Sequence, residues 1–151
     1  MKPPLFDYRS PSSLDEALSL RSEYSDDSAM LAGGQSLMPM LNLRLARPQV
    51  LIDLGHVTEL AEISEAAGGV SLGAMTRQRS AERSDLIRAR APLLQQALGY
   101  VGHPTIRNRG TVGGSLAHAD PAAELPAVCV ALDAEFVARS AAGERTITAE
   151  N

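Results

Sequence analysis

The chain has 151 residues, of which 44% are hydrophobic, and it carries a net charge of -4 with both signs interspersed. Its core must be mainly aliphatic, because Trp is absent and the chain has only 3 Tyr and 2 Phe residues. The charge balance argues against a nucleic-acid surface, no apolar run reaches transmembrane length, and the N-terminus lacks a signal-peptide pattern, so we expect a cytoplasmic protein without nucleic-acid or membrane partners.

Predicted strands and helices alternate in the first half of the chain. Ser13 and Glu16 have the spacing of a capping box, which predicts a helix start, and Asp26-Asp27 ends that helix. Strands joined by helices run parallel, so we expect a βαβαβ unit that forms a first subdomain over residues 1–57. The expected elements are an extended segment at 6–8, a helix from Ser13 to about Tyr24, a strand at 28–32, a helix from Ser36 to about Ala46 and a strand at 50–54.

A second subdomain, mixed α/β in character, is expected over residues 58–151. Gly68-Gly69 predicts a hairpin between strands at 60–63 and 70–73, and Ala142-Gly143 predicts another between 135–139 and 145–148. Residues 76–101 are expected to be helical in two pieces broken near Pro92, and a further helix is expected to end at Leu132. The second piece has a predicted buried stripe of Leu93, Leu94, Ala97, Leu98 and Val101, and a solvated face is predicted for Arg77, Arg79, Arg83, Arg88 and Arg90.

A single cysteine, Cys129, lies in an apolar run. One thiol cannot form an internal disulfide, hold an iron–sulfur cluster or complete a structural zinc site. We expect a buried core thiol, because Cys packs like a small hydrophobe in such surroundings. His56, His103 and His118 are not at ligand spacing, so no metal site is predicted.

Two small-residue segments concentrate the predicted chemistry. The first comprises Ala32, Gly33, Gly34, Gln35 and Ser36; the second comprises Thr111, Val112, Gly113, Gly114 and Ser115. Glycine leaves backbone amides uncovered, and converging amides bind phosphate, so the pair suggests a diphosphate held between them. Each segment could also be an ordinary tight connection. Neither matches the Rossmann or P-loop pattern.

Charged residues flank the second segment and leave two interpretations open. Arg107 and Arg109 could neutralise a phosphate, or they could make surface or subunit contacts. His118 follows the segment and could touch a cofactor bound there. No arrangement of Ser, His, Cys and carboxylates is spaced for nucleophilic or acid–base catalysis, so no catalytic residue is predicted.

The run from His103 to Pro126, together with residues 32–36, 50–54 and 72–76, resembles the FAD-binding medium subunit of the molybdenum hydroxylases. That family includes carbon monoxide, xanthine and nicotine dehydrogenases. The resemblance implies an α/β flavoprotein fold of the PCMH/vanillyl-alcohol-oxidase type, with FAD extended between two subdomains. It implies that residues 32–36 and 111–115 are the diphosphate loops and that Glu124 lies near the adenosine ribose, a role suited to its two acceptor oxygens. Val101 falls where some members place an aromatic ring against the adenine.

The resemblance also implies a function in electron transfer. Substrate would be oxidised on a molybdopterin large subunit, and electrons would pass through an iron–sulfur small subunit to FAD and then to an external acceptor, so the chain would be inactive alone. The helix after Ser36, with Leu37, Met38, Met40 and Leu41, is the candidate docking surface. Family members continue beyond position 151, which leaves two possibilities: a fragment of such a subunit, or a truncated non-redox homologue acting in binding or assembly.

Overall fold

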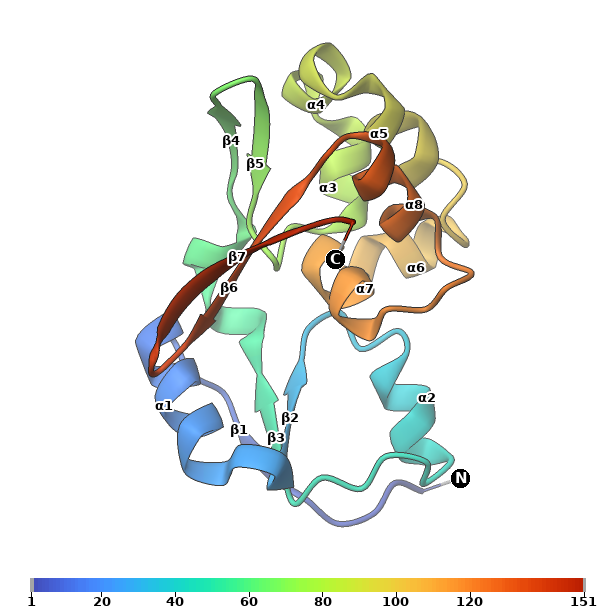
Figure 1. Ribbon diagram of the computed structural model, residues 1–151. Helices are drawn as coiled ribbons and strands as arrows, with labels where there is room; N and C mark the ends of the chain where they lie inside the picture. Colours follow the sequence, from blue (N-terminus) through green and yellow to red (C-terminus); the bar gives the residue numbers. More distant parts are fainter. Residues whose placement is uncertain (1, 151) are drawn as a thin grey trace.

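The computed structural model describes residues 2–150, and its lower part in Figure 1 is built on a small parallel sheet. The strands are β1 (Asp7–Arg9), β2 (Ser28–Leu31) and β3 (Val50–Asp53), and their order is β1-β3-β2. Both strand pairs are parallel. The crossovers contain α1 (Leu14–Tyr24) and α2 (Leu37–Asn42), so the predicted βαβαβ unit is confirmed.

Helix α1 begins where the capping pattern predicts. The Ser13 hydroxyl oxygen accepts a hydrogen bond from the Glu16 amide at 3.2 Å. The Glu16 carboxylate accepts from the amide of Ser12 at 2.8 Å, one residue earlier than a standard capping box. Helix α2 is shorter than predicted, because the chain turns away at Arg44, whose φ is 58°.

The second half contains more and shorter helices than predicted. The turns η2 (Leu54–His56) and η3 (Thr58–Ala61) delay the first hairpin strand, so the hairpin consists of β4 (Ile63–Ala66) and β5 (Gly69–Leu72). The helical stretch before residue 101 has three pieces rather than two. Ser84 ends one and caps the next, accepting from the Ile87 amide at 3.3 Å. The pieces are α3 (Gln78–Arg83), α4 (Asp85–Arg90) and α5 (Pro92–Leu98).

The glycine-rich part of the chain is also helical, which the sequence interpretation missed. It forms α6 (Pro104–Arg109) and α7 (Val112–His118), and α8 (Glu124–Ala131) follows. The predicted C-terminal hairpin is confirmed as β6 (Glu135–Ser140) and β7 (Gly143–Thr148). This hairpin runs from the helices in the upper part of Figure 1 down to α1, which β6 contacts.

An aliphatic core holds the upper helices together. The buried members are Ala81, Ile87, Ala91, Leu94, Leu98, Val112, Leu125 and Val128, and Ala97 and Val101 pack against them. The prediction for Leu93 is wrong, since its side chain is 41% exposed. Adjacent helical residues differ by about 100° in direction, so Leu94 and Leu98 face the core while Leu93 faces away.

A buried ion pair ties α6 to α3. Arg107 is only 6% exposed, and its Nε donates to Glu82 Oε2 at 3.0 Å. Its Nη1 donates to the Val101 carbonyl at 2.9 Å and to the Gly102 carbonyl at 3.2 Å. Hydrogen bonds from Arg79 and then Arg107 lower the pKa of Glu82 below its ordinary value. Arg107 is therefore committed to the fold and not to a phosphate.

The role of Arg107 can be tested by comparison with Arg109 on the same helix, which is exposed. We expect Arg107→Met to lower the free energy of unfolding by roughly 1.5–3 kcal/mol, because hydrogen bonds to charged groups contribute that much. Arg109→Met should change it by less than about 0.5 kcal/mol. Urea unfolding of FAD-free protein measures both, and equal losses would contradict the assignment.

The effect should also depend on pH. The pKa of Glu82 is lower in the folded protein than in the unfolded chain, so the stability it contributes is present above its unfolded value and lost as the pH falls through its folded value. The difference between the wild type and Arg107→Met should therefore shrink in acid.

Candidate functional site

The two glycine segments lie against each other. A Cβ atom added to Gly33 would lie 2.5 Å from the carbonyl oxygen of Arg109 and 2.8 Å from Cα of Gly110. A Cβ atom added to Gly114 would lie 3.1 Å from that of Ala32. Backbone thus meets backbone at a distance that only glycine permits. The structure brings together the two segments that the sequence interpretation singled out.

The second segment is fixed by pairing with the chain before α3. Thr111 forms an antiparallel bridge with Arg77. The Val112 amide donates to the Thr76 carbonyl, and the Gly113 amide donates to the Ala74 carbonyl, both at 2.9 Å. Backbone pairing with residues 74–78 therefore holds residues 110–113 at the edge of the parallel sheet.

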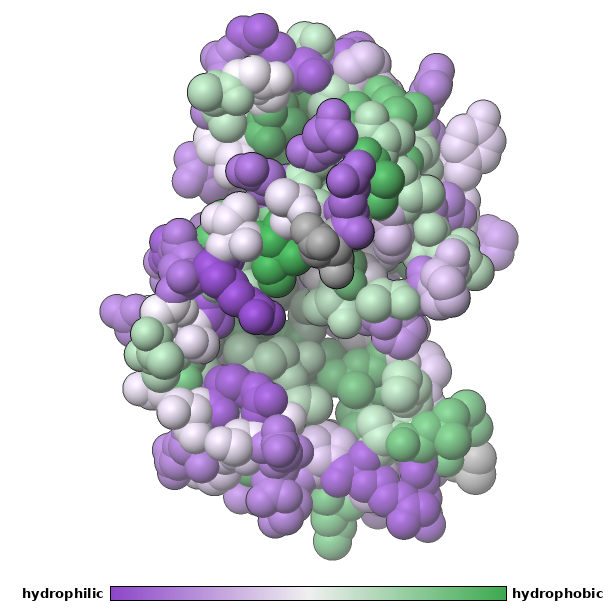
Figure 2. Space-filling view, viewed as in Figure 1, coloured by the Kyte–Doolittle hydropathy of each residue, from purple (hydrophilic) through white to green (hydrophobic). Residues whose placement is uncertain are grey.

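A cleft of about 330 Å³ opens at this junction. Its walls include Gly33, Gly34 and Gln35 of the first segment, Asp53 after β3, and Arg77 from the second half. The cleft lies beyond the carboxyl ends of β2 and β3, where α/β sheets bind ligands. Figure 2 shows the surface hollowed between the upper and lower parts of the molecule.

The first segment has free donors. Within residues 2–150, the backbone amides of residues 33–36 donate no hydrogen bond. Gly34 has a φ of +72°, a conformation that other residues rarely adopt, so the segment can turn where it does only because of this glycine. Ser36 precedes α2 without making a side-chain cap for it. The segment fits the predicted nest of uncovered amides.

The second segment is different, because its amides are already used. Val112 and Gly113 donate as described above, Gly114 donates to Thr111 Oγ1 at 3.1 Å, and Ser115 donates to the Thr111 carbonyl at 3.2 Å. The expectation of bare amides is therefore wrong for these four residues. The space beside the two glycines of this segment is filled by the protein, since a Cβ atom added to Gly113 would lie 2.6 Å from Cα of Ala74 and one added to Gly114 would lie 2.6 Å from Thr111 Oγ1. Ser115 is partly exposed.

Two arginines supply positive charge at the cleft. Arg109 and Arg77 both line it, and Arg77 Nη1 donates to the Arg109 carbonyl oxygen. The prediction that Arg77 belongs to a solvated face is wrong. Its position follows from the bridge to Thr111, a long-range pairing that has no signal in the local sequence.

Residues 111–115 and the remaining candidate residues are not among those that line the cleft. Glu124 is the first residue of α8 and is partly exposed. Its side chain makes no hydrogen bond or ion pair within residues 2–150. His118 is exposed at the end of α7. Cys129 is only partly buried, which corrects the expectation of a core thiol, and this burial raises the pKa of the thiol above its ordinary value.

The docking helix is also more buried than expected. Leu41 is fully buried in the core, and Met38 lines the cleft. The large exposed apolar side chains in this region follow the helix, at Leu43 (54% exposed) and Leu45 (73% exposed).

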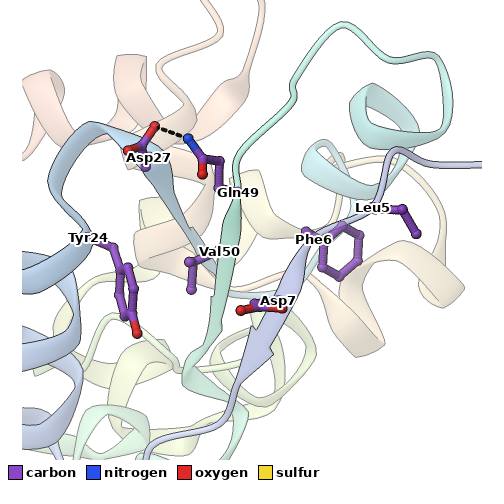
Figure 3. A pocket seen from close by; sticks show the side chains of 7 residues that line it. All are labelled: Leu5, Phe6, Asp7, Tyr24, Asp27, Gln49 and Val50. Atoms are coloured by element: carbon purple, nitrogen blue, oxygen red, sulfur yellow. Dashed lines mark hydrogen bonds between the residues drawn. The ribbon is translucent and has the colours of Figure 1, made fainter.

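A second hollow, of about 600 Å³, lies at the opposite end of the sheet (Figure 3). It is lined at the start of β1 and β3 by residues that include Phe6, Asp7 and Val50. Gln49 Nε2 donates to Asp27 Oδ1 at 2.8 Å across one side of it. Neither glycine segment reaches this hollow, so it is separate from the cleft.

Residues 2–150 contain no cluster of three His, Cys, Asp or Glu side chains able to hold a metal ion. Among the same residues, no helix has the length and apolar character needed to cross a membrane.

The parallel sheet and the cleft at its carboxyl edge place the chain among the α/β proteins that bind extended cofactors. More specifically, it belongs to the family described as the FAD binding domain in molybdopterin dehydrogenase, which matches residues 4–151.

Named relatives support this membership. The chain is 49% identical over 147 residues to the alpha subunit of the 6-hydroxypseudooxynicotine dehydrogenase complex of Paenarthrobacter nicotinovorans, covering 97% of this chain and 50% of that protein. It matches the solved carbon monoxide dehydrogenase from Hydrogenophaga pseudoflava with a TM-score of 0.96 at 43% identity, covering 99% of this chain and 52% of that one. For quinoline 2-oxidoreductase from Pseudomonas putida 86, the TM-score is 0.95 at 44% identity, with the same coverages of 99% and 52%. The chain thus spans about half the length of the relatives it matches.

Proposed function

We propose that this chain holds the adenosine diphosphate portion of FAD in the flavin-binding component of a molybdenum hydroxylase. The observation that carries the proposal is a cleft lined by the first glycine segment, which has unused backbone amides and packs against the second segment. The proposed binding residues are those of the two segments and Glu124. The proposed subdomain boundary, between residues 57 and 58, falls between η2 and η3.

The donors and charges of the cleft suit a diphosphate. The amides of residues 33–36 would donate to phosphate oxygens, while the second segment, which packs against the first, would hold the first in position. Arg77 and Arg109 would offset the negative charge. The Glu124 carboxylate, which lacks a protein partner within residues 2–150, would accept from a ribose hydroxyl.

Electron transfer and partner subunits are part of the same proposal. FAD, when bound, supplies the redox chemistry, and the protein binds and orients it. The relatives are named as components of dehydrogenases, one of them as a subunit of a dehydrogenase complex and another as the medium chain of carbon monoxide dehydrogenase. We therefore propose an iron–sulfur small subunit as electron donor, a molybdopterin large subunit as the site of substrate oxidation, and an external electron acceptor. The proposed location is the cytoplasm, a reducing compartment that suits the free thiol of Cys129.

The role of the first segment is tested by Gln35→Glu. Gln35 is exposed and lines the cleft, so a carboxylate there should repel a diphosphate and weaken FAD binding by roughly 3- to 10-fold. Gln96→Glu, an identical change on the exposed side of α5, is the matched control and should leave affinity unchanged. Titration of FAD into FAD-free, full-length protein measures both. If the two variants bound FAD with equal affinity, the diphosphate would not bind at this segment.

The role of Glu124 is tested by its replacement. Glu124→Ala should weaken FAD binding by roughly 10- to 150-fold, because a hydrogen bond to a charged group contributes about 1.5–3 kcal/mol. Glu124→Gln keeps an acceptor oxygen and should lose less. The same titration applies, and an unchanged affinity for Glu124→Ala would leave the side chain with no part in ribose binding.

The electron-transfer role is tested by reconstitution. Purified full-length protein with FAD, substrate candidates and a dye acceptor should show no substrate-dependent dye reduction, because the chain has a single cysteine for iron–sulfur ligation. After the iron–sulfur and molybdopterin subunits are added, substrate-dependent dye reduction should appear. Turnover by the flavin component alone would refute the assignment. A colourless protein that fails to take up FAD would favour the non-redox alternative.

A further inference from the structure

One carboxylate, that of Asp53, lines the cleft among groups suited to an anion. Asp53 ends β3, and both of its oxygens are engaged within the protein. Oδ1 accepts from the Gly55 amide at 2.8 Å. Oδ2 accepts from the Tyr8 hydroxyl at 2.5 Å. A carboxylate beside a diphosphate is repulsive, so what holds this side chain matters to any anion that binds here.

We propose that Tyr8 is a positioning residue that holds the Asp53 carboxylate in the wall of the cleft, so that the cleft accepts an anionic ligand. The inference rests on the proposed function, since the anion in question is the FAD diphosphate. Tyr8 lies on β1, where it is paired in register with Leu51 of β3. Its hydroxyl group therefore reaches along the neighbouring strand to the carboxyl end of β3.

The bond is a strong one by its chemistry. An O–H group that donates to a carboxylate at this distance forms a charge-assisted hydrogen bond, which is stronger than a neutral one. The same bond is the main cause of the raised pKa of Tyr8. Without it, Oδ2 would have no donor from the described residues.

Without the hydrogen bond from Tyr8, the Asp53 carboxylate would be free to turn toward cationic side chains of the cleft. The cationic side chains that line the cleft are Arg77 and Arg109. A carboxylate free to turn toward them would offset the positive charge that the diphosphate needs, besides repelling the ligand directly. The Tyr8 hydroxyl thus acts on the ligand through Asp53 and makes no contact with it.

The test is a double-mutant cycle in FAD-free, full-length protein, with FAD affinity measured at low and high ionic strength. Tyr8→Phe keeps the ring and removes only the hydroxyl group; Asp53→Asn removes the charge and keeps an acceptor for the Gly55 amide. We expect Tyr8→Phe to weaken FAD binding by roughly 3- to 10-fold at low salt and by less at high salt, because salt screens charge repulsion. In the Asp53→Asn background, the same Tyr8→Phe change should alter affinity by less than about 2-fold.

Three outcomes would overturn the inference. If wild type and Tyr8→Phe bind FAD equally, the hydroxyl group has no positioning role. If Tyr8→Phe causes the same loss with Asp53 or Asn at position 53, and at both salt concentrations, its role is structural support alone. If the wild-type protein itself binds no FAD, the proposed function fails and this inference fails with it. In the first two outcomes the wild-type protein does bind FAD, so only the inference fails.

Discussion

The site depends on one close contact, that of the Gly33 backbone with the corner formed by Arg109 and Gly110. There is no room for a side chain, because an added Cβ would lie 2.5 Å from a carbonyl oxygen. This contact joins the end of β2 to the turn between α6 and α7, and the cleft lies beside it. The hydrogen bond from Arg77 to the Arg109 carbonyl holds the same corner from the other side. A shift of this corner would move both glycine segments relative to each other, and with them every donor in the cleft.

The balance of charge in the cleft follows from what each group is bonded to. Arg107 is near in sequence to the cleft residues, but it bonds to Glu82 and two backbone carbonyls and does not line the cleft. Arg109 is exposed there, and Arg77 arrives through long-range pairing. Charge composition alone would have counted these arginines equally. Their positions differ, because Arg107 is buried in its ion pair whereas Arg77 and Arg109 line the cleft.

The predictable parts of the structure are those set by local patterns. The parallel sheet follows from apolar strands alternating with helices, and the hairpins follow from Gly68-Gly69 and Ala142-Gly143 between short strand-forming runs. Helix α7 could not be predicted in this way. Its first turn contains Gly113 and Gly114, which disfavour a helix, and it is stabilised by tertiary bonds from Val112 and Gly113 to residues 74–76. The resemblance to a family singled out both segments, which the structure brings into contact, but it did not reveal which of their amides are free.

That difference between the segments limits what each can do for a bound cofactor. The first segment offers donors that nothing in the described chain uses, and the second offers small residues whose amides are already bonded. The cleft, at about 330 Å³, is near the lower end of the range of roughly 300–1,000 Å³ for ligand pockets. It suits a diphosphate and its adjoining sugar better than a whole flavin dinucleotide. The relatives are about twice as long as this chain, so in them a further stretch of protein is available to enclose the remainder. The cleft would therefore contribute to the proposed function by holding the diphosphate end of the cofactor, and the rest of the cofactor would lie outside it.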